Sequence, residues 1–194
     1  MTNFTESLKG YAFQGVGADM RGRHAVGIVA FAVAAAFSAQ IAVPLPWTPV
    51  PVTLQPMIVI LAGAMLGPRL GALAMASYVT VGGMGAPVFS NVGAGLGWLF
   101  GPTGGYLLAA PAAAFLVGMI AGRSGQAWRL IAGLVGGVGT MYVGGVLQLI
   151  AYTGLDFGTA LMAGVVPFVI GDVTKIGFAF FAVLALRAGA KGSD

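Results

Sequence analysis

Residues 25–43 read AVGIVAFAVAAAFSAQIAV, nineteen residues without a charged side chain. An α-helix needs about 20 mostly apolar residues to cross a bilayer, so this stretch predicts a membrane span. The whole chain has the same character, because 58% of its 194 residues are hydrophobic and only 7% are charged. A soluble domain carries about a quarter charged residues. The composition therefore excludes a soluble domain and predicts an all-α integral membrane protein.

Further apolar segments continue the pattern along the chain. We expect five more spans, over residues 53–66, 70–81, 104–121, 130–152 and 169–186. A short helix near 159–166 is expected before the last span, because Pro167 and Gly171 interrupt a stretch too long for one straight crossing. Prolines between the first two spans predict an extended loop over residues 44–52. Residues 82–103 form a long glycine-rich connection.

The basic residues test this count of six spans. Eight of the nine lie outside the spans, in the two tails and in the loops after the second and fourth spans: Lys9, Arg21, Arg23, Arg69, Arg123, Arg129, Arg187 and Lys191. Loops on the cytoplasmic side of a membrane carry an excess of Lys and Arg. We therefore expect a six-transmembrane-helix bundle with both termini cytoplasmic. Its parts are an N-terminal tail (1–24), one transmembrane domain (25–187) and a C-terminal tail (188–194).

The composition also excludes several chemistries. Without cysteine the chain has no disulfide, thiolate metal site or cysteine nucleophile, and its one histidine, His24, lies beside a charged tail. The glycine-rich stretches 93–97 and 101–105 lack the Lys-Ser/Thr pair of a nucleotide phosphate loop. The basic residues are spread over helix ends, which indicates membrane topology and not nucleic-acid binding. We expect no enzymatic activity, no metal and no cofactor.

Two charges remain inside the last span. Asp172 and Lys175 lie three residues apart, so a helix places them on one face. Ionisable residues within a span are costly and usually pair or line a functional cavity. A structural ion pair and a ligand-recognition pair are both compatible with this spacing. The upstream break at Pro167 favours ligand recognition, because interrupted helices occur where irregular backbone lines a cavity.

The outer loops supply further candidate ligand contacts. Asn91 both donates and accepts hydrogen bonds, which suits an amide- or urea-like group. Aromatic side chains in the same regions are suited to an apolar ring: Trp47, Phe89, Trp98 and Tyr106. For Trp47 and Trp98 an interfacial aromatic belt is the equally weighted alternative.

Small residues recur at spacings of four in the first span. Ala30, Ala32, Ala34 and Ala36 form two such pairs, and small residues four apart let membrane helices approach closely. Packing within the chain and docking of another membrane protein are both compatible with this pattern.

The chain resembles a known family in four stretches that occur in the expected order. Residues 44–55 (PLPWTPVPVTLQ) are similar to its first outer loop, 82–89 (GGMGAPVF) and 101–106 (GPTGGY) to its central signature, and 167–175 (PFVIGDVTK) to its C-terminal one. The family is BioY, the biotin-specific substrate-binding (S) component of energy-coupling factor transporters. The resemblance covers residues 31–186.

The resemblance implies high-affinity capture of biotin from outside, in a bacterial cytoplasmic membrane. It implies a pocket lined by Asn91, Asp172 and Lys175, with Trp47, Phe89, Trp98 and Tyr106 as further candidates. It also implies partners: a transmembrane coupling protein docked on Ala30, Ala32, Ala34 and Ala36, and two cytoplasmic ATP-binding-cassette ATPases.

Two other function classes are compatible with parts of the sequence. In a proton-coupled secondary transporter of a small carboxylate-bearing vitamin, Asp172 is the proton carrier, but the chain lacks a visible inverted repeat. An intramembrane enzyme would have little catalytic material, because the spans contain one Asp and one Lys and no His.

Overall fold

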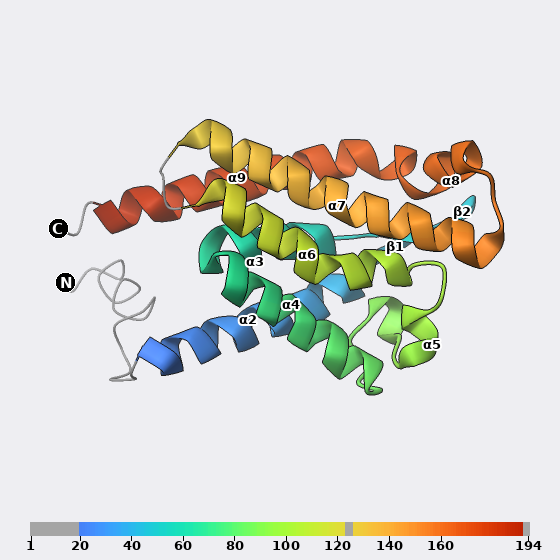
Figure 1. The fold of residues 1–194 in the computed structure, drawn as a ribbon, viewed down its shortest axis with the longest axis horizontal. Helices are drawn as coiled ribbons and strands as arrows, with labels where there is room; N and C mark the ends of the chain where they lie inside the picture. The colour runs from blue at the N-terminus through green and yellow to red at the C-terminus, as the bar shows by residue number, and fades with distance from the viewer. Residues whose placement is uncertain (1–19, 123–125, 192–194) are drawn as a thin grey trace.

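The computed structural model describes residues 20–122 and 126–191. These residues are mostly helical, and the long helices run side by side in an elongated bundle (Figure 1). The long helices are α2 (Met20–Gln40), α3 (Gln55–Leu66), α4 (Pro68–Gly83), α6 (Gly104–Ala121), α7 (Ala127–Thr153) and α9 (Val169–Lys191). The shorter elements are β1 (Ala42–Leu45), β2 (Thr48–Thr53), η1 (Ser90–Val92), α5 (Leu96–Leu99), α8 (Phe157–Gly164) and η2 (Val166–Phe168).

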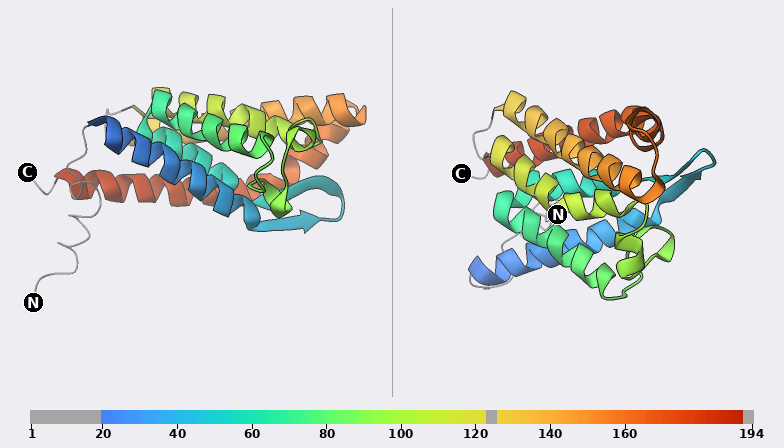
Figure 2. Two further views of the ribbon diagram at one scale, coloured as in Figure 1. Left: turned by 90° about the horizontal axis from the view of Figure 1, so that it is seen from below. Right: turned by 45° about the vertical axis from the view of Figure 1, so that its right-hand side comes forward.

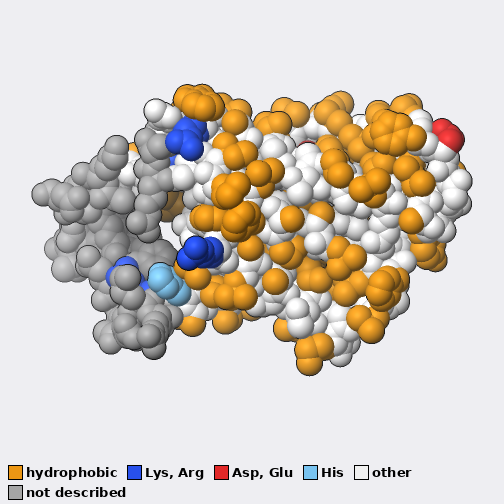
Figure 3. All heavy atoms as spheres, in the orientation of Figure 1, with side chains coloured by type: hydrophobic (Ala, Val, Ile, Leu, Met, Phe, Trp, Pro, Cys, Tyr) orange, Lys and Arg blue, Asp and Glu red, His pale blue; other side chains and the backbone are white. Residues whose placement is uncertain are grey.

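The two ends of the bundle differ in structure and charge. The start of α2, the α3–α4 turn, the end of α6, the start of α7 and the end of α9 lie at one end, on the left in Figure 1. The β1–β2 hairpin, α5 and α8 lie at the other end, as the two views of Figure 2 also show. On the face drawn in Figure 3, the Lys and Arg side chains gather at the first end. We call these the basic end and the cap end.

Each expected span corresponds to a helix, but several boundaries differ. Residues 20–24, assigned to the N-terminal tail, already belong to α2, and α2 ends at Gln40 because the chain turns into β1. Residues 188–191, assigned to the C-terminal tail, continue α9. Arg and Lys are good helix formers, so a helix does not stop where the apolar stretch stops. Lys9 and Arg123 lie outside the described residues.

Four segments in the described part of the chain are long and apolar enough to cross a membrane: Gly22–Gln40, Gly104–Ala121, Ala127–Thr153 and Phe157–Gly189. The last of these contains the break expected at Pro167, because α8 ends at Gly164 and Pro167 lies in η2. Gly171, expected to share in the break, lies within α9. Helix α3 has only 12 residues, a length of about 18 Å. By this measure α3, one of the six predicted spans, is therefore too short to cross a membrane as a helix.

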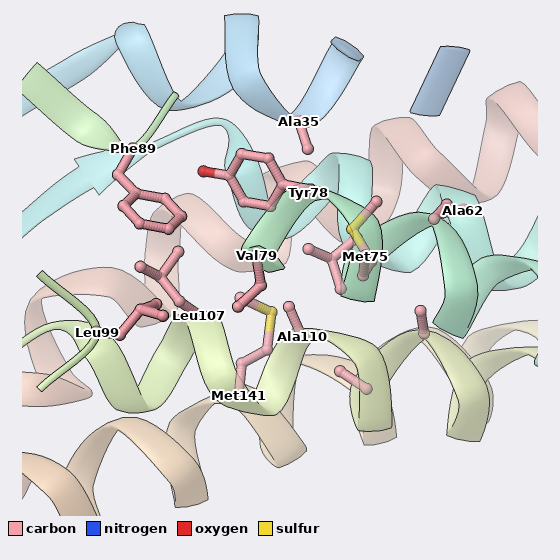
Figure 4. Close-up of a cluster of buried hydrophobic side chains, with 14 residues drawn as sticks. Ala35, Ala62, Met75, Tyr78, Val79, Phe89, Leu99, Leu107, Ala110 and Met141 are labelled. Carbon is pink, nitrogen blue, oxygen red and sulfur yellow. The ribbon is translucent and has the colours of Figure 1, made fainter. Parts of the chain in front are cut away.

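The core lies between α3, α4, α6 and α7 and is built from small and apolar side chains (Figure 4). Helices α6 and α7 pack with their backbones in contact: a Cβ on Gly105 would lie 2.1 Å from the Gly144 carbonyl oxygen. Small residues allow such approach in membrane proteins, where packing drives helix association. This tight pair is the frame that positions the cap end.

The proline-rich stretch forms a hairpin where the sequence predicted an extended loop. Strands β1 and β2 are antiparallel, with Ala42 opposite Thr53 and an irregularity between Val43 and Leu45. Both strands are edges, so each proline can avoid a ladder position that needs its missing N–H. The Thr48 hydroxyl donates to the Ala163 carbonyl at 2.8 Å and thereby fixes the hairpin to α8.

Candidate functional site

A pocket lies at the cap end of the bundle, under the β1–β2 hairpin. The free space in and around it is about 570 Å³, part of which is open solvent. Two helices, α3 and α9, begin at this pocket. Its lining is Val50, Pro51, Thr53, Gln55, Pro56, Ser90, Trp98, Thr103, Tyr106, Leu107, Met141, Tyr142, Phe168, Asp172 and Lys175.

The predicted charged pair lies in this lining and is buried. Asp172 is 4% exposed and Lys175 is 7% exposed. The Lys175 ammonium donates to Asp172 Oδ1 at 2.7 Å, and the Tyr142 hydroxyl donates to Oδ2 at 2.6 Å. Asp172 also lies in the first turn of α9, where the helix dipole favours a negative charge. The pair is thus neutral as a whole and held by two helices, α7 and α9.

Tyr106 forms the wall next to the charged pair. Its hydroxyl donates to the Gly164 carbonyl at 2.6 Å. Its ring lies against Gly145 of α7, where an added Cβ would come within 2.1 Å of the ring. Only glycine leaves this space, so Gly145 determines where the Tyr106 ring lies in the pocket.

A second, outer cavity adjoins the pocket. It shares Pro51, Ser90, Trp98 and Thr103 with the pocket, and its further lining includes Asn91 and Tyr152. Asn91 is exposed and adopts a left-handed backbone with φ 53°. The structure therefore brings Asp172, Lys175, Trp98 and Tyr106 together in the pocket and places Asn91 in the outer cavity.

The other two predicted aromatic residues lie away from both cavities. Trp47 is 67% exposed at the tip of the hairpin. Phe89 is fully buried in the core, where its ring meets Tyr78 edge-to-face at 5.6 Å and leaves no room for a Cβ on Gly82. Figure 4 shows the two rings together. In this structure Phe89 packs the core beneath the loop and Trp47 faces outward.

The alanines of α2 divide between two faces. Ala32 and Ala36 pack against the core, whereas Ala30 is exposed and Ala34 is half-buried. Large apolar residues surround Ala30 on the exposed face: Val26, Val29, Val33 and Phe37. Ala30 is therefore the most open of the four to another protein, whereas Ala32, Ala34 and Ala36 are all half-buried.

Several polar residues at the cap end were missed by the sequence reasoning. Tyr142 bonds Asp172, Gln148 donates to the carbonyls of Leu99 and Gly101 at 2.7 Å each, and Gln40 bonds the loop after α4. Each lies in an otherwise apolar predicted span or at its end. Polar side chains within spans are a usable signal, because they need internal partners.

Comparison with known proteins gives matches over most of the chain. The BioY family model matches residues 13–192. The biotin transporter BioY of Thermotoga maritima is 44% identical over 144 residues, which cover 74% of this chain and 83% of that protein. The probable biotin transporter BioY of Pyrococcus horikoshii is 40% identical over 151 residues, covering 77% and 88%.

A solved structure shares the fold. The crystal structure of an S-component for biotin from an ECF-type ABC transporter superimposes with a TM-score of 0.79. The superposition covers 89% of this chain and 95% of that one, at 23% sequence identity. Together with the apolar helices, these matches make the chain a multi-pass membrane protein.

Proposed function

The chain belongs to the BioY family, and we propose that it is the membrane-embedded biotin-binding component of a vitamin uptake transporter. The resemblance seen in the sequence is thereby confirmed at the level of the family. The main observation in favour of biotin as the substrate is the buried Asp172–Lys175 pair in an otherwise largely apolar pocket. This chemistry suits biotin, which combines a polar ureido ring, an apolar sulfur-containing ring and a carboxylate.

We assign Asp172 to the ureido N–H groups. Each of its oxygens already accepts one internal hydrogen bond, and a carboxylate has about four acceptor positions in total. Lys175 has three donors, of which Asp172 accepts one. Lys175 therefore neutralises Asp172 and offers its other donors to the ligand carbonyl or carboxylate. Trp98 and Tyr106 supply the apolar walls.

We keep Asn91 as a proposed ligand contact from the outer cavity. Asn91 is adjacent in sequence to Ser90, which lines both cavities. Its amide suits the ureido group or the carboxylate of a ligand that extends from the pocket into the outer cavity.

We propose that α2, α3, α4, α6, α7 and α9 are six membrane crossings in a bacterial cytoplasmic membrane, with the basic end and both termini cytoplasmic. Basic residues at that end support this orientation. Helix α3 is short because it begins at the floor of the pocket, with Gln55 and Pro56 in the lining. In the outer part of the membrane, the hairpin and the pocket would lie where a longer α3 would otherwise cross.

The transport cycle requires partners in this proposal. A transmembrane coupling protein docks on the exposed face of α2, and ATP-binding-cassette ATPases supply the energy. The alternative, a proton-coupled secondary transporter with Asp172 as carrier, predicts uptake that an uncoupler abolishes and that needs no ATPase.

Calorimetry on the purified protein in detergent tests the substrate. We expect biotin to bind the unmodified chain, and Asp172→Asn and Lys175→Ala each to weaken binding by about 100-fold, as expected when a buried charge loses its partner. Val135→Ala, on an exposed face of α7, serves as the control. The absence of biotin binding by the unmodified chain would contradict the proposed function.

A further inference from the structure

Gln40, the last residue of α2, bonds two backbone groups of a loop 49 and 52 residues away. Its Nε2 donates to the Phe89 carbonyl at 2.9 Å, and its Oε1 accepts from the Val92 amide at 3.1 Å. One side chain thus uses both ends of its amide to hold a segment of the glycine-rich connection. Gln40 itself is exposed, so burial of its side chain does not account for these contacts.

The segment that Gln40 holds has an unfavourable backbone. Asn91 and Val92 are both left-handed, with φ 53° and φ 60°. Asparagine tolerates this conformation, but a β-branched residue such as Val92 does not adopt it without strain. The Val92 side chain is 67% exposed, so burial of the side chain does not explain its conformation. The hydrogen bond from its amide to Gln40 favours the strained conformation.

The same segment forms part of the pocket. The Phe89 amide donates to the Gly93 carbonyl at 2.9 Å, and the Gly93 amide donates to the Ser90 carbonyl at 3.0 Å, which closes residues 89–93 into one unit. Ser90 lines the pocket. Gly93 lies against the Trp98 indole, where an added Cβ would come within 2.6 Å. A movement of this unit therefore displaces both Ser90 and Trp98.

We propose that Gln40 is a positioning residue that keeps the 89–93 segment closed over the bound ligand and so slows ligand release. Gln40 does not touch the pocket, and it acts through Ser90, Asn91 and Trp98. This inference rests on the proposed function for the identity of the ligand.

Dissociation of radiolabelled biotin from the purified protein, chased with excess unlabelled biotin, tests this role. Gln40→Ala is expected to dissociate about tenfold faster, the size expected for the loss of the two hydrogen bonds that join Gln40 to the loop. Gln40→Glu retains the acceptor for the Val92 amide and is expected to be intermediate. The matched control is Ile41→Ala, because Ile41 is the next residue and is 59% exposed. We expect its dissociation rate to equal that of the unmodified chain.

A second substitution separates positioning from a general structural role. Glycine adopts the left-handed conformation without the steric strain of a β-branched residue, so Val92→Gly is expected to restore slow dissociation in the Gln40→Ala background. A general loss of structure would not be rescued in this way. In the absence of biotin, hydrogen exchange of residues 89–93 is expected to rise in Gln40→Ala.

The outcomes that overturn this proposal are distinct from failure of the proposed function. A Gln40→Ala dissociation rate equal to that of the unmodified chain overturns it. A faster rate that Val92→Gly leaves unchanged also overturns it, as does unchanged hydrogen exchange of residues 89–93. Failure of the unmodified chain to bind biotin instead refutes the proposed function.

Discussion

Asp172 uses one acceptor position of each carboxylate oxygen inside the protein. Tyr142 and Lys175 donate to different oxygens, so the carboxylate plane is fixed from two helices before a ligand arrives. Preorganisation of this kind lowers the entropic cost of binding. The remaining acceptor positions are available to two N–H groups of a ureido ring in our proposal.

Tyr142→Phe tests this arrangement at the scale of one hydroxyl. The substitution keeps the ring and removes the donor to Asp172 Oδ2, so biotin affinity measured by calorimetry is expected to fall about tenfold, as for a hydrogen bond to a charged group. Thr140→Val is the control, because the Thr140 hydroxyl lies on the same helix and donates to the Gly136 carbonyl within that helix. Equal affinities for Tyr142→Phe and the unmodified chain would show that Asp172 does not depend on this bond.

The sequence could predict the charged pair but not its third member. Asp172 and Lys175 are conspicuous because they are the only charges in the last span and lie three residues apart. Tyr142 lies 30 residues away in α7, and a single tyrosine in an apolar span does not reveal its partner. Phe89 shows the opposite case: an aromatic residue in a predicted binding loop packs in the core, because the loop folds back onto α4.

At the scale of elements, the pocket exists because two helices begin beneath the cap end. Helix α3 begins at Gln55 and α9 at Val169, and residues of the first turn of each line the pocket. The positive ends of both helix dipoles are therefore close to the pocket, which favours a ligand carrying negative charge.

A substitution at Gly145 tests the packing of α6 against α7. Because a Cβ at this position would come within 2.1 Å of the Tyr106 ring, Gly145→Ala is expected to displace the ring and weaken biotin binding by about tenfold or more. Gly139→Ala on the same helix is the matched control, since nothing lies within 4 Å of the added atom. Calorimetric affinities that are equal for the two variants would argue against a role for Tyr106 in the pocket wall.

The start of α8 depends on pH through Asp156. Hydrogen bonds from the Thr159 side chain and backbone lower the pKa of this exposed carboxyl below its usual value. A lowered pKa in the folded state means that the cap stabilises α8 above the unfolded-state pKa and is lost as the pH falls through the lowered value. The contribution should therefore be complete at neutral pH and disappear in the acid range below about pH 4.

Hydrogen exchange at the Thr159 and Ala160 amides measures this cap. Asp156→Ala is expected to accelerate exchange by a fewfold at neutral pH, whereas Asp156→Asn retains an N-cap acceptor and is expected to leave it nearly unchanged. The same exchange in all three proteins would show that Asp156 does not cap the helix.

The elements themselves were largely predictable, whereas their ends were not. Residues 104–121 match α6 at both ends, and Gly122, with φ 44°, terminates the helix at its C-terminal end. The sequence predicts a loop for the proline-rich stretch, whereas the structure has a hairpin that Thr48 joins to Ala163 of α8, 115 residues away. Such a tertiary contact leaves no local pattern in the sequence.

At the scale of the whole molecule, our proposal assigns biotin and the coupling protein to different parts of the bundle. The pocket lies at the cap end, whereas the exposed apolar face of α2 runs toward the basic end. Binding and energised uptake should therefore be separable by substitution.

Ala30→Trp tests this separation. Because Ala30 is exposed, a bulky side chain is accommodated by the isolated protein but prevents close approach of another helix. Biotin uptake by cells that contain the coupling protein and ATPases is expected to fall about tenfold, with biotin affinity of the purified protein unchanged. The control is Val135→Trp, on an exposed face of α7. Normal uptake by Ala30→Trp would remove this face from the proposed interface.

The most direct test of the central claim is an experimental structure of the protein determined with biotin. We predict one biotin molecule in the pocket between Trp98 and Tyr106, with its polar groups within hydrogen-bond distance of Asp172 and Lys175. Biotin bound elsewhere, or a pocket without biotin at a concentration that saturates binding in solution, would contradict the account.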